Sequence, residues 1–246
     1  MKTFALTLGS VVTAASLTLA ADAAMVAQWD FQTTTNGGTA AVAAPNSPLT
    51  YVANFGTGTL YANGTNGSSS WVQANSGNQI NAFGGTALNA TGSMSTVTTG
   101  SAALGLVGGA ATGSTFAANG KSIVFKFSMT DLGNLAISYA TQRTATGFTT
   151  QQWDYSTDGT NWTTGTTISS IQSSFASGTG SATNVSITSG LNNATTAYVR
   201  VTFTGATANG GNNRLDNIQF NADAVPAPGA LALLGVAGLV GARRRR

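Results

Sequence analysis

The chain has 246 residues, enough for one large domain or two small ones, and only 7% are charged, against roughly 25% in typical globular proteins. It contains no Cys, His or Glu, which excludes disulfides, thiol nucleophiles, Ser-His-Asp triads and zinc sites built on Cys or His. The net charge is +3, but Lys2 and the last four arginines supply half of the ten basic residues. The rest of the chain lacks the basic face that nucleic-acid binding requires, so no nucleic-acid partner is expected.

The first 24 residues are typical of a secretory signal peptide. Lys2 supplies a positive start, residues 4–20 form an apolar stretch, and residues 21–23 place small side chains around a cleavage site near Ala23 or Ala24. We therefore expect residues 1–24 to form a signal helix that is removed during export. The alternative is an uncleaved membrane anchor.

Residues 25–222 are predicted to form one β domain, because Thr and Val favour strands whereas Gly and Asn favour turns. Apolar residues alternate with polar ones in several runs, which is typical of half-buried antiparallel strands. These runs begin at Trp29 and Phe31 and continue at residues 121–129, 135–142, 197–204 and 214–220.

Turn signals separate these runs. Asp158-Gly159 predicts a hairpin, and residues 132–134 are predicted to join two strands. Residues 84–118 are rich in glycine and are predicted to form loops with one or two weak strands. Roughly ten to fourteen short strands favour an all-β fold, an antiparallel β-sandwich or jelly roll, flanked by an N-terminal signal helix and a short C-terminal apolar helix.

Two tryptophans are candidates for sugar binding. Trp71 lies in a Ser/Asn-rich stretch and Trp162 follows a turn, so both are expected to be more exposed than Trp29 and Trp153, which sit in alternating strands. An exposed indole ring stacks on sugar rings in many binding modules. The alternative for Trp71 and Trp162 is ordinary packing in the core.

Asp154 and Asp158 form the one local pair of acids in the predicted domain. A glycosidase needs two carboxylates, one of them with a raised pKa, at a defined separation. Asp158 opens an Asp-Gly turn, where a carboxylate ordinarily accepts hydrogen bonds from the local backbone. Turn chemistry is therefore the favoured interpretation of Asp158.

Asp216 is the most informative single residue. Strict alternation places it on the face of Ile218 and Phe220, and a buried carboxylate needs a partner. Arg200 and Arg143 are candidates for an ion pair. The alternative is a structural Ca²⁺ ion, to which Asp30 would add an oxygen, because the first and last strands of a jelly roll lie side by side. No other cofactor is expected.

The C-terminal tail has three parts, the motif Val225-Pro226-Ala227-Pro228, an apolar segment at residues 229–242, and four arginines. The apolar segment is short for a membrane-spanning helix, which needs about 20 residues, and arginine stays on the cytoplasmic side of a bilayer. This layout predicts transient contact with the inner membrane, with the domain outside. The alternative is a plain C-terminal membrane anchor.

The tail resembles the PEP-CTERM sorting domain, with residues 225–228 as its motif and Arg243, Arg244, Arg245 and Arg246 as its terminal cluster. The resemblance implies processing by exosortase, a membrane-embedded protease. Ala227 stands where the family usually has Glu. The body also resembles the jelly-roll ectodomains common in these proteins, at residues 29–31, 142–147, 155–162 and 214–220.

These observations divide the chain into a signal peptide (1–24), a β-sandwich domain (25–222) and a sorting tail (223–246). The predicted function is that of an exported, non-catalytic protein at the cell surface, in the outer membrane or outside the cell, with a structural or adhesive role. Exosortase and an exopolysaccharide are its expected partners. A carbohydrate-binding module is the first alternative, and a glycan-active enzyme is the second.

Overall fold

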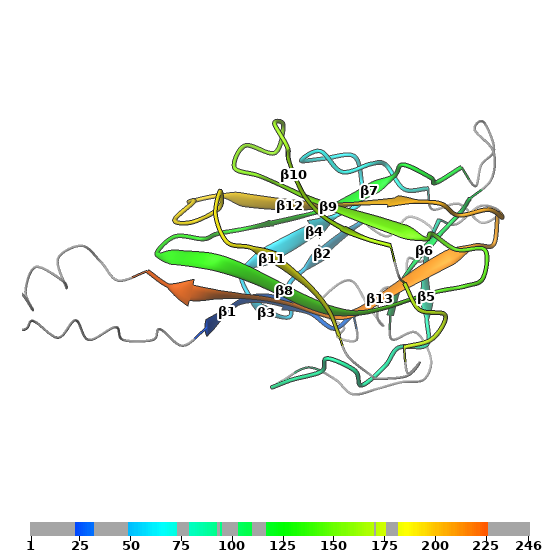
Figure 1. The fold of residues 1–246 in the computed structure, drawn as a ribbon, viewed down its shortest axis with the longest axis horizontal. Helices are drawn as coiled ribbons and strands as arrows, with labels where there is room; N and C mark the ends of the chain where they lie inside the picture. The colour runs from blue at the N-terminus through cyan, green and yellow to red at the C-terminus, as the bar shows by residue number, and fades with distance from the viewer. Residues whose placement is uncertain are drawn as a thin grey trace, which may run out of the picture.

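The structure is a computed structural model in which every regular element of the described residues is a β-strand (Figure 1). The predicted all-β class is therefore confirmed for these residues. No helix among them is long and apolar enough to cross a bilayer. The predicted C-terminal apolar helix lies outside them, and so does the predicted signal helix apart from Ala23 and Ala24, which belong to a strand. The described residues are 23–31, 49–72, 79–92, 94, 103–109, 117–169, 171–175 and 182–225.

Seven antiparallel strands form the first sheet, here called sheet A. Its longest members, β8 and β13, pair along most of their length, and β1 pairs with the other edge of β13. β3 extends the sheet beyond β1, β11 extends it beyond β8, and β6 joins β13 to β5. The strands are β1 (Ala23–Trp29), β3 (Phe55–Gly56), β5 (Ile80–Phe83), β6 (Ala103–Val107), β8 (Leu132–Arg143), β11 (Thr183–Ile187) and β13 (Asn212–Ala224).

Six antiparallel strands form sheet B, in the order β10-β9-β12-β7-β4-β2. The Asp158-Gly159 turn joins β9 to β10, as the sequence predicts. The strands are β2 (Thr50–Val52), β4 (Gly58–Tyr61), β7 (Ser122–Phe127), β9 (Thr150–Ser156), β10 (Thr163–Ile168) and β12 (Ala197–Thr204).

The two sheets pack face to face on an aromatic core. Trp29 of β1 meets Phe125 of β7 with ring centroids 4.9 Å apart, and Phe125 meets Phe220 of β13 at 5.0 Å. All three side chains are fully buried. Burying a side chain of this size stabilises a fold by about 1.5–3 kcal/mol, so these contacts between the sheets hold the sandwich together without any disulfide.

Alternation located several of the strands correctly. β12 coincides with the predicted strand at residues 197–204, and β7 lies within the predicted run 121–129. One expected turn is wrong, because residues 132–134 already belong to β8, and the chain reverses just before them. A strand predicted only as weak, β6, is fully formed inside the glycine-rich region 84–118.

Candidate functional site

An open groove of about 340 Å³ lies on the outer face of sheet B, where β4 and β7 run side by side. The side chains of Leu60, Phe125 and Phe127 are buried in the core, so alternation turns the intervening Thr59, Tyr61 and Lys126 outward. Hydroxyl groups dominate the lining. The groove is lined by Thr57, Gly58, Thr59, Tyr61, Lys126, Phe127, Ser128, Thr195 and Thr196.

Lys126 is the one charged residue of this groove. Its ammonium lies 5.8 Å from the ring centroid of Tyr198, the residue opposite it on β12. The other cations of the described ranges bind protein acceptors: Arg200 binds a carboxylate, and Lys121, Arg143 and Arg214 bind backbone carbonyls. The described part of the chain offers Lys126 no such hydrogen bond. Its positive charge therefore remains available to a ligand.

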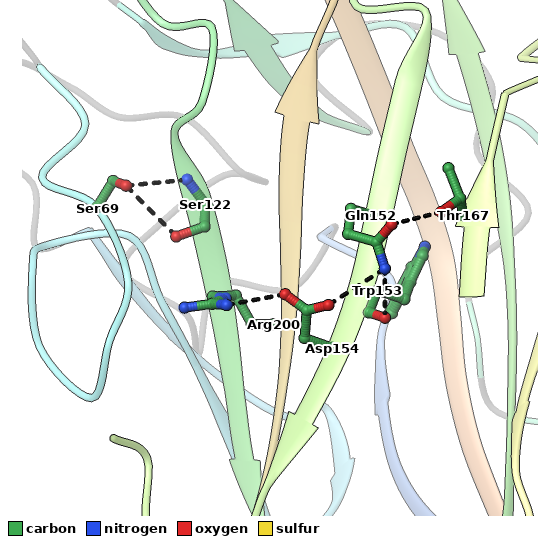
Figure 2. A network of polar contacts seen from close by, with 7 residues as sticks. All are labelled: Ser69, Ser122, Gln152, Trp153, Asp154, Thr167 and Arg200. Atoms are coloured by element: carbon green, nitrogen blue, oxygen red, sulfur yellow. Dashed lines mark hydrogen bonds and ion pairs between the residues drawn. The ribbon is translucent and has the colours of Figure 1, made fainter. Parts of the chain in front are cut away.

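Arg200 belongs to a second polar group on the same face, drawn in Figure 2. Its Nη2 lies 2.8 Å from Oδ2 of Asp154, the residue directly opposite it in the β12–β9 register. Gln152 donates from Nε2 to the other oxygen of Asp154 at 3.2 Å, and accepts a hydrogen bond from the Thr167 hydroxyl. The group links three neighbouring strands across the outside of sheet B.

The proposed pairing of Arg200 with Asp216 is wrong, because Arg200 lies in sheet B and pairs with Asp154 there. Arg143 is not its partner either. That guanidinium donates to the backbone carbonyls of Ile171, Thr144 and Ala145.

The two candidate tryptophans differ in their surroundings. Trp71 is only 2% exposed, packs edge-on against Phe148 and Phe203, and donates from Nε1 to the Ser122 carbonyl. The expectation of an exposed Trp71 is therefore wrong, and this ring cannot stack on a sugar. Trp162 is half-buried, and the guanidinium carbon of Arg200 lies 4.3 Å from its ring centroid. The arginine thus covers one face of Trp162.

Asp158 serves the hairpin turn. Its Oδ1 accepts hydrogen bonds from the backbone N–H groups of Thr160 and Asn161, both at 2.8 Å, and Oδ2 accepts one from the Asn161 side chain. These hydrogen bonds hold the pKa of the Asp158 carboxyl well below its usual range. Asp154 binds Arg200 and Gln152, whereas Asp158 binds its own turn, so the two carboxylates have separate structural partners and are not arranged as a glycosidase pair.

A β-bulge in β13 changes the placement of Asp216. The register shifts between Asp216 and Gln219, and Asn217 adopts a left-handed backbone conformation with φ +47°. Leu215 and Ile218 both lie in the core, so the bulge puts Asp216 on the outer face of sheet A. The prediction that Asp216 shares a face with Ile218 and Phe220 is therefore wrong, because strict alternation does not continue through a bulge.

Asp216 is nevertheless 0% exposed, because residues 84–92, here called the covering segment, lie over this part of sheet A. Its Oδ2 accepts a hydrogen bond from the Thr86 N–H at 2.8 Å, and its Oδ1 accepts one from the Asn217 N–H at 2.9 Å. Burial, with a smaller contribution from the nearby negative charge of Asp30, raises the pKa of Asp216 to about 8, against the lowering effect of these two hydrogen bonds.

Asp30 lies beside Asp216, as the first-strand and last-strand argument predicts. It follows Trp29, which pairs with Ile218, and it is 2% exposed. Sequence reasoning missed Asn217, whose side chain also lies against the covering segment. The sequence feature that could have identified Asn217 is an amide side chain close to apolar residues of a predicted strand. No group of three or more Asp, Glu, His or Cys side chains suited to a metal ion occurs among the described residues.

No family model matches the chain, and no curated protein matches it. Among solved structures, it is similar to a carbohydrate-binding module, TmCBM61, in complex with β-1,4-galactotriose, with 11% identity and a TM-score of 0.32. That match covers 50% of this chain and 72% of the module. The K2 cleaved adhesin domain of Lys-gingipain matches with 15% identity and a TM-score of 0.31, over 51% and 74% of the two chains. Matches at this level establish no shared function.

Proposed function

We propose that this chain is an exported, non-catalytic adhesive protein that holds an acidic polysaccharide in the groove on sheet B. The proposed route of export is of the PEP-CTERM type, with cleavage of the signal peptide and processing of the tail by exosortase. The proposed location is the cell surface or the extracellular matrix. The sequence of the two ends supports the route, through the apolar stretch at residues 4–20, the motif at 225–228 and the arginines at 243–246.

The groove is the observation that carries the adhesive role. Hydroxyl groups exchange hydrogen bonds readily with the hydroxyls of a sugar, and the Tyr61 ring offers an apolar edge to its C–H groups. Lys126 adds one positive charge with no carboxylate in the lining. A sugar polymer that carries carboxylates or sulfates supplies the missing counter-charge, so we favour an acidic exopolysaccharide over a neutral one.

The alternative is a carbohydrate-binding module that uses the same groove for neutral sugars. Its specific support is the hydroxyl-rich lining around Tyr61, which suits neutral sugars as well. The two functions differ in their dependence on Lys126 and on salt. Binding of an acidic polymer weakens as ionic strength rises, whereas binding of a neutral sugar is largely insensitive to it.

The binding test uses the secreted protein with a polyuronate and a neutral glucan as probes. We expect the polyuronate to bind, with a loss of about tenfold in affinity for Lys126→Gln, the change that follows from one charge-assisted hydrogen bond. Thr164→Ala, on exposed β10 three strands away from β7, is the matched control and should bind normally. Equal polyuronate affinity of wild type and Lys126→Gln, or no binding at all, would overturn the proposed adhesive role.

The export route is tested separately by the intact mass of the native protein after cell fractionation. We expect a surface or extracellular product that lacks residues 1–24 and the terminal arginines. Replacement of all four arginines by Gln should retain the protein at an earlier stage of export. A cytoplasmic protein with both ends intact would contradict the route, whatever the result of the binding assay.

A further inference from the structure

Three buried polar side chains meet on the outer face of sheet A. Asp216 and Asn217 are both 0% exposed and Asp30 is 2% exposed. They lie where the end of β1 meets the middle of β13, at the pair formed by Trp29 and Ile218. The covering segment closes this layer from outside, because the Thr86 N–H donates to Asp216 and the Asn217 Nδ2 donates to the carbonyls of Thr86 and Leu88.

The bulge directs two consecutive side chains to the same place. Asp216 and Asn217 both contact Thr86, at its N–H and at its carbonyl oxygen, with distances of 2.8 and 2.7 Å. In a regular strand these neighbours would point to opposite faces of the sheet. A bulge that aims a carboxylate and an amide together, at a left-handed Asn217, is a typical means of building a site.

The amide oxygen of Asn217 is the independent sign of a ligand. Both hydrogen atoms of its NH₂ group have acceptors, yet Oδ1 is buried and none of the described residues donates a hydrogen bond to it. Leaving a buried polar atom unpaired costs about 1–3 kcal/mol. Asp216, the preceding residue, and Asp30 carry two buried carboxyl groups that repel one another when both are ionised. A cation here would offset that repulsion and could give the Asn217 oxygen a partner.

We propose that Asp30, Asp216 and Asn217 bind a structural Ca²⁺ ion between sheet A and the covering segment. The donors are all oxygen atoms, and the chain contains no Cys or His, which suits a hard cation and not zinc or copper. Calcium accepts six to eight oxygen ligands in flexible geometry, so backbone carbonyls and water complete its shell. Magnesium requires stricter octahedral geometry and gives up its water reluctantly.

Asp30 is held in place for this role by its neighbours. Its backbone N–H donates to Oδ1 of Asn54 at 2.8 Å, and the next residue, Phe31, has the left-handed φ of +54° that turns the chain away from β1. Phe31 is itself buried against the Tyr51 ring. The ion would thus join the first strand, the last strand and the covering segment, and it would stabilise the sandwich independently of the groove on sheet B.

The test is calcium binding by the full secreted protein after treatment with a chelator. We expect about 10 mM CaCl₂ to raise Tm by about 3–8 °C, since extracellular calcium sites have dissociation constants of about 0.1–1 mM. The same concentration of MgCl₂ should have a much smaller effect. Terbium should bind in place of calcium and luminesce on excitation of tryptophan, because Trp29 adjoins Asp30.

Asp216→Asn should abolish both the Tm rise and the terbium signal. Asn replaces one of the two oxygens that accept backbone N–H groups, so we expect a lower metal-free Tm for this variant, and each calcium response is scored against the metal-free Tm of the same variant. Asp30→Asn serves as a second test of the same site. Asp223→Asn, near the end of the same strand and outside the cluster, is the matched control and should respond to calcium normally. No response in the wild type, or an unchanged response in Asp216→Asn, would overturn the proposal in favour of two acids that share a proton.

Discussion

Arg200 and Asp154 form an ion pair across two strands of sheet B, with Nη2 and Oδ2 2.8 Å apart. The two side chains are 25% and 9% exposed, so the pair lies between a surface salt bridge and a buried one. Trp162 covers the guanidinium from one side and Gln152 binds the second carboxylate oxygen. The pair is therefore better ordered than an isolated pair in water.

We predict that Asp154→Ala lowers the free energy of unfolding by about 1–3 kcal/mol, because it leaves the Arg200 charge half-buried without its partner. Urea unfolding of Asp154→Ala, Arg200→Met and the double variant measures the coupling between the two side chains. We expect a coupling of about 1 kcal/mol. Additive effects within about 0.3 kcal/mol would mean that the pair contributes no net stability.

The interior of the sandwich contains a second group of hydrogen-bonded side chains, centred on Tyr139. The Tyr139 hydroxyl donates to Oε1 of Gln151 at 2.6 Å and accepts from Nε1 of Trp153 at 3.1 Å, with all three side chains buried. Tyr139→Phe removes both bonds and leaves two unsatisfied groups, so we expect a loss of about 1–3 kcal/mol in urea unfolding. Tyr61→Phe, in the open groove, should change stability by no more than about 0.5 kcal/mol.

How far the sequence predicts this molecule depends on whether a feature is periodic. The alternation of Val199, Val201 and Phe203 placed β12 at the correct residues, because all three side chains of this regular strand pack in the same core. The same reasoning failed at Asp216. One extra residue in a bulge moves the side chains that precede it in the strand to the opposite face of the sheet. The sequence Arg214-Leu-Asp-Asn-Ile does not show where the bulge lies.

The sequence also did not predict which distant residues contact one another in the fold. The sequence offered Asp216 as the partner of Arg200, and only the register between β12 and β9 selects Asp154. Trp71 lies in a polar stretch that favoured exposure, yet the chain folds its ring against Phe148 and Phe203. Local composition reports the preference of a segment, whereas burial depends on which distant segment covers it.

Gly56 of β3 lies at the edge of sheet A, at a position that has no room for a side chain. It has φ +70°, and a Cβ atom there would lie 2.0 Å from the backbone oxygen of Val26 on β1. Gly56→Ala therefore has to break the pairing of β3 with β1 or distort both strands, and we expect a loss of about 2–5 kcal/mol. Thermal melting measures it. Gly210→Ala, where no atom lies within 4 Å of the added carbon, is the control and should be nearly neutral.

The Asp158 turn predicts how stability changes in acid. Its hydrogen bonds lower the pKa of the folded carboxyl below the unfolded value of 3.8, so the folded protein binds this proton less readily than the unfolded chain. The contribution is fully present above about pH 5, and it is lost as the pH falls through 3.8 and toward the lower folded pKa.

Asp158→Asn cannot ionise, so its urea midpoint should fall less steeply than that of the wild type between about pH 5 and pH 2. Asp131→Asn is the control, because it removes an exposed negative charge at a different turn. It shows how much of the effect comes from losing one charge and how much from losing the hydrogen bonds of the Asp158 turn. If the wild type and Asp158→Asn lose stability in parallel over this range, the carboxylate does not stabilise the hairpin, and its hydrogen bonds to Thr160 and Asn161 are exchanged for water at no cost.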